Sequence, residues 1–264
     1  MRAGVARFIL VCFSLSVIGL VFLEQSSAEI DLETCVAAWL FEEGAGKKIK
    51  DSSEYGNDGD IQGDPGWVAG KFGKALDFDG AADHVIVPDS DSLDLNHITM
   101  AAWVNLRSYP DDQRIITKEF GAVDPYSIYT LLMSDPGETK LEFRPVLDNT
   151  RYRINSNADI PLNQWTHVAA TFDGENCVLY INGEIDKEEP HTGTMLTNDE
   201  PVYLGASQFW DPRFFDGLMD EAVLFNVALT QDDIKSLMEK GLSTILAVSS
   251  AGKLVTTWAQ IKNP

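Results

Sequence analysis

Short β-prone segments, each ended by a cluster of glycine, proline, asparagine or aspartate, follow one another from residue 35 to about residue 228. Within this region no apolar repeat at helical spacing is long enough to supply the crossover helices of a parallel sheet. Many short strands separated by turn residues are typical of sandwiches and jelly rolls. The sequence therefore predicts an all-β domain made of two antiparallel sheets.

Two local patterns sharpen this prediction. Asn182-Gly183 stands between two β-prone runs, and these residue types favour the positive φ angles of a two-residue type I′ hairpin turn. Further along, Thr230 is a suitable helix N-cap and Gly241 a suitable stop, with an apolar stripe at helical spacing between them. We expect a tight hairpin at 182–183 and one short C-terminal helix that closes the domain.

The N-terminal residues have the pattern of a secretory signal peptide. Arg2 and Arg7 give a positive start, an apolar run covers residues 8–23, and Ser26-Ser27-Ala28 offers the small residues that precede a cleavage site. The run is shorter than the ~20 residues that a membrane-spanning helix needs. We therefore expect a secreted or periplasmic protein without a membrane span after cleavage. Its parts are the signal peptide (1–28), the β domain (36–240) and a C-terminal tail (241–264).

The charge of the chain limits its partners. Its 264 residues include 20 Lys and Arg and 41 Asp and Glu, a formal net charge of −21. Removal of residues 1–28 takes away two arginines and one glutamate, so the charge becomes −22. Such a charge repels phosphate groups and anionic lipid surfaces, which excludes nucleic acid as a partner. The carboxylates then serve solubility, or some of them supply oxygen ligands to a hard cation such as Ca²⁺.

Several segments stand in an order that is hard to attribute to coincidence. They are Trp39-Leu-Phe-Glu-Glu-Gly44, Asp51-Ser-Ser-Glu-Tyr-Gly-Asn-Asp-Gly59, Gly73-Lys-Ala-Leu-Asp-Phe-Asp-Gly80, Asp83-His-Val-Ile-Val-Pro-Asp89, Ile98-Thr-Met-Ala-Ala-Trp-Val104, Trp165-Thr-His-Val-Ala-Ala-Thr-Phe-Asp-Gly174, Leu179-Tyr-Ile-Asn-Gly183 and Asp216-Gly-Leu-Met-Asp-Glu-Ala-Val-Leu-Phe-Asn226. Together they resemble the laminin G-like jelly-roll family of the concanavalin A-like lectin/glucanase superfamily, over roughly residues 36–240. The resemblance implies a jelly roll of two packed sheets. It leaves function open, because the superfamily contains lectins, glycan-binding modules, glycosidases and adhesion domains.

One loop combines aromatic and polar residues suited to a sugar. In residues 207–216, Trp210 can stack on a sugar ring and Arg213 can donate paired hydrogen bonds, with Gln208 beside them. A second patch, residues 107–114, begins with Arg107 and Tyr109 and is expected to line the same rim. We predict that these five residues bind carbohydrate. Burial of Trp210 in the fold is the alternative.

A calcium site is predicted near the start of the domain. Asp51 and Asn57 belong to a short loop rich in side-chain and carbonyl oxygens, which Ca²⁺ requires. In the resembling family the first and last strands lie side by side, which implies that Asp220 completes the shell, with Glu43 nearby. The alternative is a loop whose acidic groups cap backbone N–H groups without a metal.

Some apolar and sulfur-containing residues are expected in the interior. Trp39, Trp103 and Trp165 alternate with small or apolar residues and are assigned to the core. After signal cleavage two cysteines remain, Cys35 and Cys177. In an oxidising compartment they can form one disulfide if their Cα atoms come within about 7 Å. Two buried free thiols are the alternative.

The strongest catalytic candidate is weak. Glu184-Ile-Asp-Lys-Glu188 has the spacing that places three carboxylates on one strand face, and in β-glucanase relatives of the superfamily the outer pair acts in hydrolysis. Here the run follows a hairpin turn directly and contains Lys187, which favours a solvated strand. We expect a non-catalytic module that binds carbohydrate or an extracellular partner, with a structural Ca²⁺. The alternatives are a glycoside hydrolase using Glu184 and Glu188, and a purely structural or adhesion domain.

Overall fold

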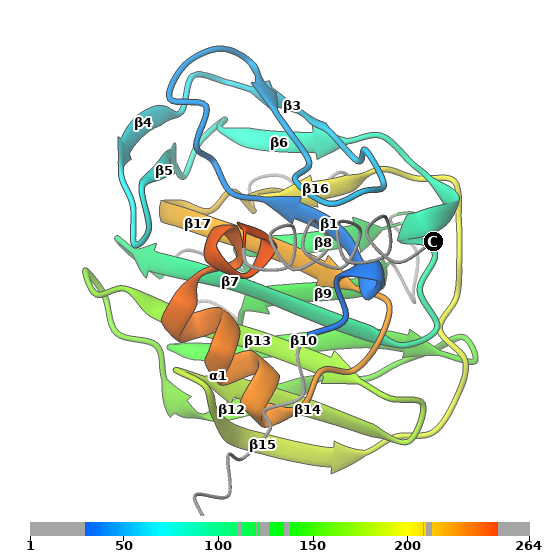
Figure 1. The fold of residues 1–264 in the computed structure, drawn as a ribbon. Helices are drawn as coiled ribbons and strands as arrows, with labels where there is room; N and C mark the ends of the chain where they lie inside the picture. The colour runs from blue at the N-terminus through cyan, green and yellow to red at the C-terminus, as the bar shows by residue number, and fades with distance from the viewer. Residues whose placement is uncertain are drawn as a thin grey trace, which may run out of the picture.

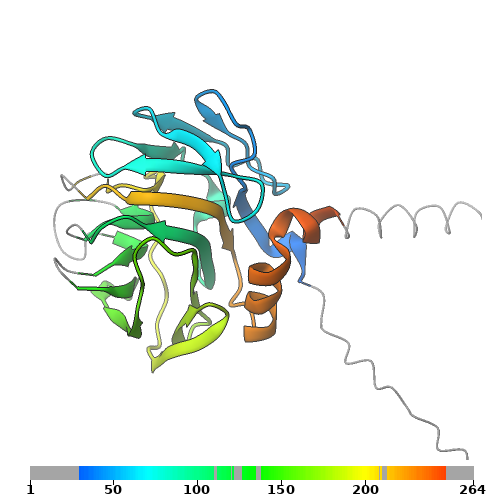
Figure 2. The same cartoon turned by 90° about the vertical axis from the view of Figure 1, so that its left-hand side faces the viewer.

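The computed structural model describes residues 30–109, 112–119, 121, 127–134, 138–207, 209 and 213–247. These residues form two antiparallel sheets packed face to face, with an α-helix against the outside of one of them (Figure 1). The view in Figure 2 shows the helix on one side of this sandwich. The expected signal peptide, most of the expected tail and the predicted residues Gln208 and Trp210 lie outside the described residues.

Sheet A is the sheet that the helix covers. Across it lie β15 (Glu184–Pro190), β14 (Asn176–Ile181), β13 (Thr166–Phe172), β7 (Ile98–Leu106), β17 (Asp216–Phe225), β5 (Lys74–Asp79) and β4 (Gly66–Ala69), with β1 (Cys35–Trp39) also paired to β17. The first and last strands of the sequence, β1 and β17, are thus neighbours, as the resemblance implied.

Sheet B faces it across the core. Its order is β11 (Thr150–Arg151), β10 (Lys140–Leu147), β9 (Ser127–Met133), β8 (Arg114–Glu119), β16 (Val202–Leu204), β6 (His84–Val87), β3 (Gly59–Gln62) and β2 (Lys48–Ile49), with β12 (Ile154–Asp159) also paired to β10. Short 3₁₀ turns, η1 (Leu32–Thr34) and η2 (Asp91–Leu93), precede β1 and β7. Every pairing between these strands is antiparallel, so the predicted two-sheet jelly-roll sandwich is confirmed.

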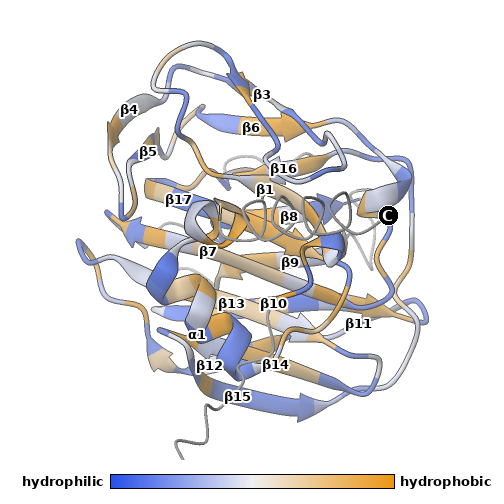
Figure 3. Ribbon diagram, viewed as in Figure 1, coloured by the Kyte–Doolittle hydropathy of each residue, from blue (hydrophilic) through white to orange (hydrophobic). Residues whose placement is uncertain are grey.

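The core lies between the two sheets and takes apolar residues from both. Alternate residues of β13, such as Val168, Ala170 and Phe172, point into it. Figure 3 shows that hydrophobic segments concentrate on the central strands, whereas the edge strand β15 is hydrophilic. This is the arrangement expected when strand alternation places one set of side chains in a shared core.

A second, smaller apolar cluster lies between sheet A and the helix α1 (Gln231–Lys240). Ile234 and Leu237 of α1 are buried against Ala101, Ala169 and Val223 of the sheet. A further helical turn at 242–247 adds two buried side chains, Leu242 and Ile245. The packed part of the chain therefore continues past residue 240, where the tail was expected to begin.

The locally determined elements agree with the sequence. Thr230 caps α1 in a capping box with Asp233, and Gly241 ends the helix with a φ of 70°. Asn182 and Gly183, with φ of 50° and 76°, connect β14 to β15, as a type I′ turn requires.

The three tryptophans expected in the core have different environments. Trp39 is fully buried between the sheets and donates from Nε1 to the carbonyl oxygen of Asn57 at 2.8 Å. Trp103 is buried on the outer face of sheet A instead, where Phe72 packs edge-on against it. Trp165 is only half-buried, because it directly precedes β13. The core assignment is correct for Trp39, and Trp165 contradicts it.

Candidate functional site

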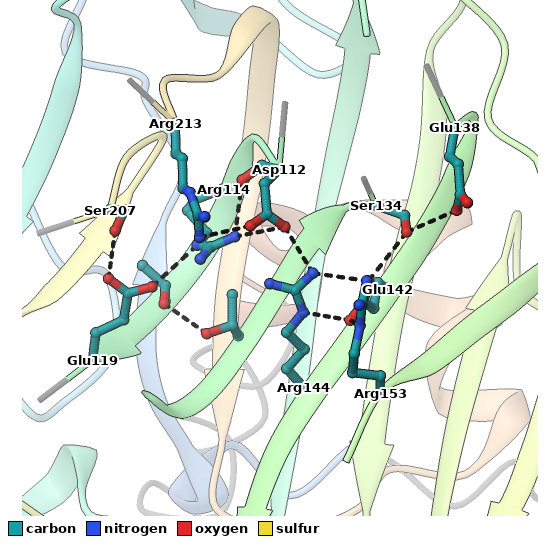
Figure 4. Close-up of polar contacts among 12 residues, drawn as sticks. Asp112, Arg114, Glu119, Ser134, Glu138, Glu142, Arg144, Arg153, Ser207 and Arg213 are labelled. Carbon is teal, nitrogen blue, oxygen red and sulfur yellow. Dashed lines mark hydrogen bonds and ion pairs between the residues drawn. The ribbon is translucent and has the colours of Figure 1, made fainter. Parts of the chain in front are cut away.

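Charged side chains line the outer face of sheet B. On β10 the residues at 141 and 143 lie in the core, so the alternation of the strand turns Glu142 and Arg144 to the opposite face. On β8 and β9, Thr117 and Thr130 are paired in register, with their hydroxyl oxygens 2.7 Å apart. Figure 4 shows how residues on these strands and on neighbouring loops form a connected polar network.

Asp112 lies at the centre of the network between three guanidinium groups. Its carboxylate oxygens are 2.6 Å from Arg213 Nη1, 2.7 Å from Arg144 Nη2 and 3.2 Å from Arg114 Nη1. Arg114 and Arg144 form ion pairs with Asp112 Oδ1, but their N–H groups are not aligned to donate hydrogen bonds to it. Burial opposes ionisation, but the charges of the neighbouring arginines outweigh it and hold the pKa of Asp112 below its ordinary value. A left-handed φ of 53° keeps the carboxylate there.

Glu142 forms the second centre. Arg153 donates to its two oxygens at 2.7 and 2.9 Å, and Arg144 contacts both oxygens from the other side. Ser134 Oγ lies 3.1 Å from the same carboxylate and 3.0 Å from that of Glu138. Burial would raise the pKa of Glu142, but hydrogen bonds from Arg153 and Arg144 outweigh this effect and lower it. Arg144 therefore links the two centres.

A third carboxylate closes the network towards β16. Arg114 donates from Nε to Glu119 Oε1 at 3.1 Å, and Ser207 donates to Oε2 at 2.6 Å. Arg114 also donates to the backbone carbonyl of Asp112 at 2.9 Å. Asp112, Glu119 and Glu142, the buried carboxylates of the network, are thus each bound by at least one guanidinium, as burial of charge demands.

Two arginines of the network, Arg153 and Arg213, are partly exposed, whereas Arg114 and Arg144 are buried. The side chains of Asp112, Glu119 and Glu142 are at most 6% exposed, whereas those of Arg153 and Arg213 are 39% and 24% exposed. Guanidinium groups held by buried carboxylates lose little conformational freedom when they bind a partner. Arg153 and Arg213 therefore present oriented hydrogen-bond donors at the surface.

A group of half-buried aromatic rings lies on the same face. Tyr203 of β16 pairs in register with Thr117, which places its ring beside the network. His84 stacks on Tyr203 with a centroid distance of 5.9 Å and an interplanar angle of 21°, and Phe214 lies 5.8 Å from His84. We call Tyr203, His84 and Phe214 the aromatic patch. Tyr203, Thr117, Thr130 and Arg144 pair in register across β16, β8, β9 and β10, so the patch and the network are continuous.

The residues predicted to bind a ligand do not all lie at this site. Arg213 belongs to the network. Arg107 instead binds Asp216 at 2.6 Å and Asp77 against the outer face of sheet A, and Tyr109 donates to the carbonyl oxygen of Ile160 at 2.6 Å. The hydrogen bond that Arg107 donates to Asp77 is the main cause that holds the pKa of Arg107 above its ordinary value. The predicted second patch, residues 107–114, is therefore divided between the two faces of the sandwich. Only residues 112–114 reach the outer face of sheet B, where Arg213 lies.

The residues predicted to bind calcium are held by the chain itself. Asp51 is buried, and its two carboxylate oxygens accept hydrogen bonds from the N–H groups of residues 38, 53 and 57 and from the Ser53 hydroxyl. Asn57 donates its side-chain amide to the carbonyl of Val36 at 2.7 Å. Glu43 accepts from the N–H of Lys50 at 2.8 Å. These are the capping contacts that the sequence offered as the alternative.

Asp220 lies apart from that loop. It is fully buried on β17, accepts from the N–H of Phe72 at 2.9 Å, and has a pKa raised to about 7, chiefly by burial. Among the described residues no three His, Cys, Asp or Glu side chains are arranged to hold a metal ion. The four predicted ligands do not fit one ion as arranged, and calcium binding stays a prediction.

The predicted disulfide is corrected by the structure. Cys35 and Cys177 are both buried free thiols, and burial raises the pKa of each to about 12. Cys35 lies on β1 and Cys177 on β14, with β17, β7 and β13 between them in the same sheet. At ~4.8 Å per strand the two are roughly 19 Å apart, well beyond disulfide reach. The alternative of two buried thiols describes the structure.

A β-bulge interrupts the carboxylates of β15, Glu184 to Glu188. A bulge lies at Asp186, because Ile185 pairs with Tyr180 while Lys187 pairs with Leu179. The bulge interrupts the regular alternation of side chains along β15, and Glu184 contacts α1, where Gln231 donates to its carboxylate at 2.7 Å. An ion pair with Lys235 at 2.9 Å lowers the pKa of Glu184.

Sequence reasoning missed most of the network. Glu119, Glu142, Arg144 and Arg153 were not among the predicted site residues. The available signal was the alternation of charged and apolar residues in 140–144. Charged residues in a strand ordinarily indicate a face exposed to solvent. Here charged side chains of opposite sign, brought together from β8, β10 and the neighbouring loops, bind one another instead.

The two-sheet architecture and its polar, aromatic face define a lectin-like jelly-roll domain. Residues 79–235, more than half of the chain, match a family described as the concanavalin A-like lectin/glucanases superfamily. The chain belongs to this superfamily. A comparison with curated protein sequences found no match. Within the described residues, no helix is long and apolar enough to cross a membrane.

Solved structures with the same fold include binding domains. Domain 4 of AbnA, a GH43 extracellular arabinanase from Geobacillus stearothermophilus in complex with arabinotriose, is 24% identical, with a TM-score of 0.63, and covers 78% of this chain and 98% of its own. The binding domain of Paraclostridial Mosquitocidal Protein 1 is 18% identical with a TM-score of 0.61, over 78% of this chain and 52% of its own. A botulinum neurotoxin DC binding domain in complex with rat synaptotagmin II is 13% identical with a TM-score of 0.59, over 78% and 51%. The chain spans about half of the toxin domains, and these likenesses show the fold.

Proposed function

We propose that this chain is an exported, non-catalytic module that binds carbohydrate on the outer face of sheet B. The observation that carries the proposal is the continuity of the aromatic patch with the arginine network. An aromatic ring offers a flat apolar surface to the C–H face of a sugar, and oriented guanidinium groups donate to its hydroxyl oxygens. The bound arabinotriose of the similar arabinanase domain supports the same class of ligand.

The protonation of this face supports binding over hydrolysis. A glycosidase needs one carboxylic acid that keeps its proton near neutral pH and a second carboxylate beside it. On the outer face of sheet B the pKa values of Asp112 and Glu142 are held low by guanidinium groups. Both groups are therefore ionised and already paired, which suits positioning and not proton transfer.

A glycan array tests the proposal directly. The wild-type protein should be retained by at least one sugar, and Tyr203→Ala and Arg213→Ala should lose that retention. Loss of the charge-assisted bonds of Arg213 predicts about 10- to 100-fold weaker binding. Tyr55→Ala is the matched control, because Tyr55 is 44% exposed and lies outside the aromatic patch.

The other outcomes contradict the proposal in identifiable ways. A protein retained by no sugar is a structural or adhesion domain, and one that shortens the retained glycan is a hydrolase. Retention that survives in both variants, with thermal melting showing them folded, would place the site elsewhere. A mature mass that still includes residues 1–28 would contradict export through a cleaved signal peptide.

A further inference from the structure

A groove of about 470 Å³ lies on the outer face of sheet A, on the opposite side of the sandwich from the arginine network. The helix covers only one end of this face, where Ala101 of β7 and Val223 of β17 are packed beneath it. The groove occupies the other end of the same strands, at Asn105 and Leu218. Its volume is within the range of small-molecule sites.

The floor of the groove follows from strand register. Leu218 on β17 pairs with Asp77 on β5 and with Asn105 on β7, so these three side chains form one row across the face. Val68 of the neighbouring β4, which pairs with Ala75 of β5 two residues along the strand from Asp77, also lines the groove. The groove therefore has an aliphatic floor, from Leu218 and Val68, with polar groups on both sides.

One wall is a guanidinium in a fixed position. Arg107 binds Asp77, binds Asp216 at 2.6 Å and donates to the carbonyl of Phe78 at 3.0 Å, while its side chain stays 45% exposed. These contacts hold the guanidinium plane at the mouth of the groove. The positive charge of Arg107 is offset by the carboxylates of Asp77 and Asp216. The groove therefore has no excess positive charge and does not favour an anionic ligand.

Several polar side-chain groups at this end of the outer face of sheet A have no hydrogen-bond partner among the described residues. The side-chain amides of Asn105 and Asn163 line the groove, and within the described part of the chain neither has a hydrogen-bond partner. In the next row of the same face, Trp103 Nε1 and Asp220 Oδ1 are buried without a partner. Asn105 is half-buried and Asn163 is exposed, so both amides are accessible to a molecule that enters the groove.

We propose that this groove is a second binding site, for a neutral saccharide unit. Amides donate and accept, the carboxylate of Asp77 accepts and Arg107 donates, which matches the mixed character of sugar hydroxyls. The aliphatic floor contacts the C–H face of the ring. With ligands on both faces of the sandwich, one domain connects two glycan segments, which raises its avidity for a polysaccharide surface.

Nuclear magnetic resonance of the mature protein tests this site separately from the first one. The probes are arabinotriose, xylotriose, cellotriose and maltotriose, and the signals are the side-chain amides of Asn105 and Asn163. At least one trisaccharide should shift both signals saturably, while the exposed amide of Asn226, outside the groove, stays unchanged. Absence of such shifts with all four sugars overturns the proposal, as do equal shifts at Asn226.

Two variants locate the effect. Val68→Phe fills the groove and should remove the shifts at Asn163, and Asn105→Ala should weaken binding there about 3- to 10-fold through one lost hydrogen bond. Neither should change the shifts at Tyr203.

The same titration distinguishes the two proposed sites. If the amides of Asn105 and Asn163 shift while Tyr203 does not, the proposed function on sheet B fails and the second site stands. If Tyr203 shifts while these amides do not, only the second site is overturned.

Discussion

Neutralising the carboxylate at the centre of the arginine network should destabilise the fold strongly. Asp112→Asn keeps a side chain that tolerates a left-handed φ and keeps one acceptor oxygen, so it removes mainly the charge. Three guanidinium groups within 3.2 Å of Asp112 then lose their shared counter-ion. Removal of one partner from a buried ion pair costs about 3–5 kcal/mol. We expect about 3 kcal/mol, the lower end, because the amide oxygen remains.

Urea unfolding and thermal melting measure this loss. At ~2–4 °C per kcal/mol for a domain of this size, the melting temperature should fall by roughly 6–12 °C at neutral pH. Asp64→Asn is the matched control, because Asp64 forms an ion pair with Lys47 while its side chain is 99% exposed. That variant should lose at most about 1 kcal/mol.

The pH dependence identifies the cause. The pKa of Asp112 is lower in the folded state, so its ionisation stabilises the fold above the unfolded pKa of about 3.9, and this contribution disappears as pH falls through the folded value. The gap between wild type and Asp112→Asn should therefore be widest at neutral pH and close in acid. An Asp112→Asn protein as stable as wild type at pH 7, or a gap that persists in acid, would refute a charge-based role.

Three further predictions concern other parts of the chain. Cys35 and Cys177 should resist iodoacetamide in the native state and react on unfolding, because both are buried and their pKa values are raised to about 12. A mass 2 Da below that of the reduced chain, from ~1 Da per lost hydrogen, would reveal a disulfide instead. Ca²⁺ binding at Asp51, which stays a prediction, requires a higher melting temperature in Ca²⁺ than in EDTA; equal melting temperatures would leave Asp51, whose oxygens already accept backbone N–H groups, as a capping residue only. Thr230→Ala should cost about 1 kcal/mol by urea unfolding through loss of the N-cap, whereas an unchanged midpoint would deny the cap a role.

Features set by neighbouring residues could be predicted from the sequence. The turn at Asn182-Gly183 and the cap at Thr230 each depend on a few adjacent residues, and both occur as expected. The two-sheet fold was also predictable, because strand length and turn spacing carry that information. The adjacency of β1 and β17 came from the family resemblance, not from either strand alone.

Features set by strand order could not be predicted. Cys35 and Cys177 are separated by three intervening strands, a distance that no local pattern encodes. The charges of Arg114 and Glu142 suggested exposure, whereas β9 between β8 and β10 brings both into one buried network. Likewise Arg107 and Arg213 were grouped by composition, but the sandwich places them on different faces.

We expect the outer face of sheet B to hold carbohydrate. The most direct test is a resonance-shift map of the mature protein with the sugar best retained on the array. Saturable shifts should appear at Tyr203, His84 and the Nε–H groups of Arg153 and Arg213, with α1 unaffected. Shifts confined to α1 and β15, with the arginine signals unmoved, would contradict it.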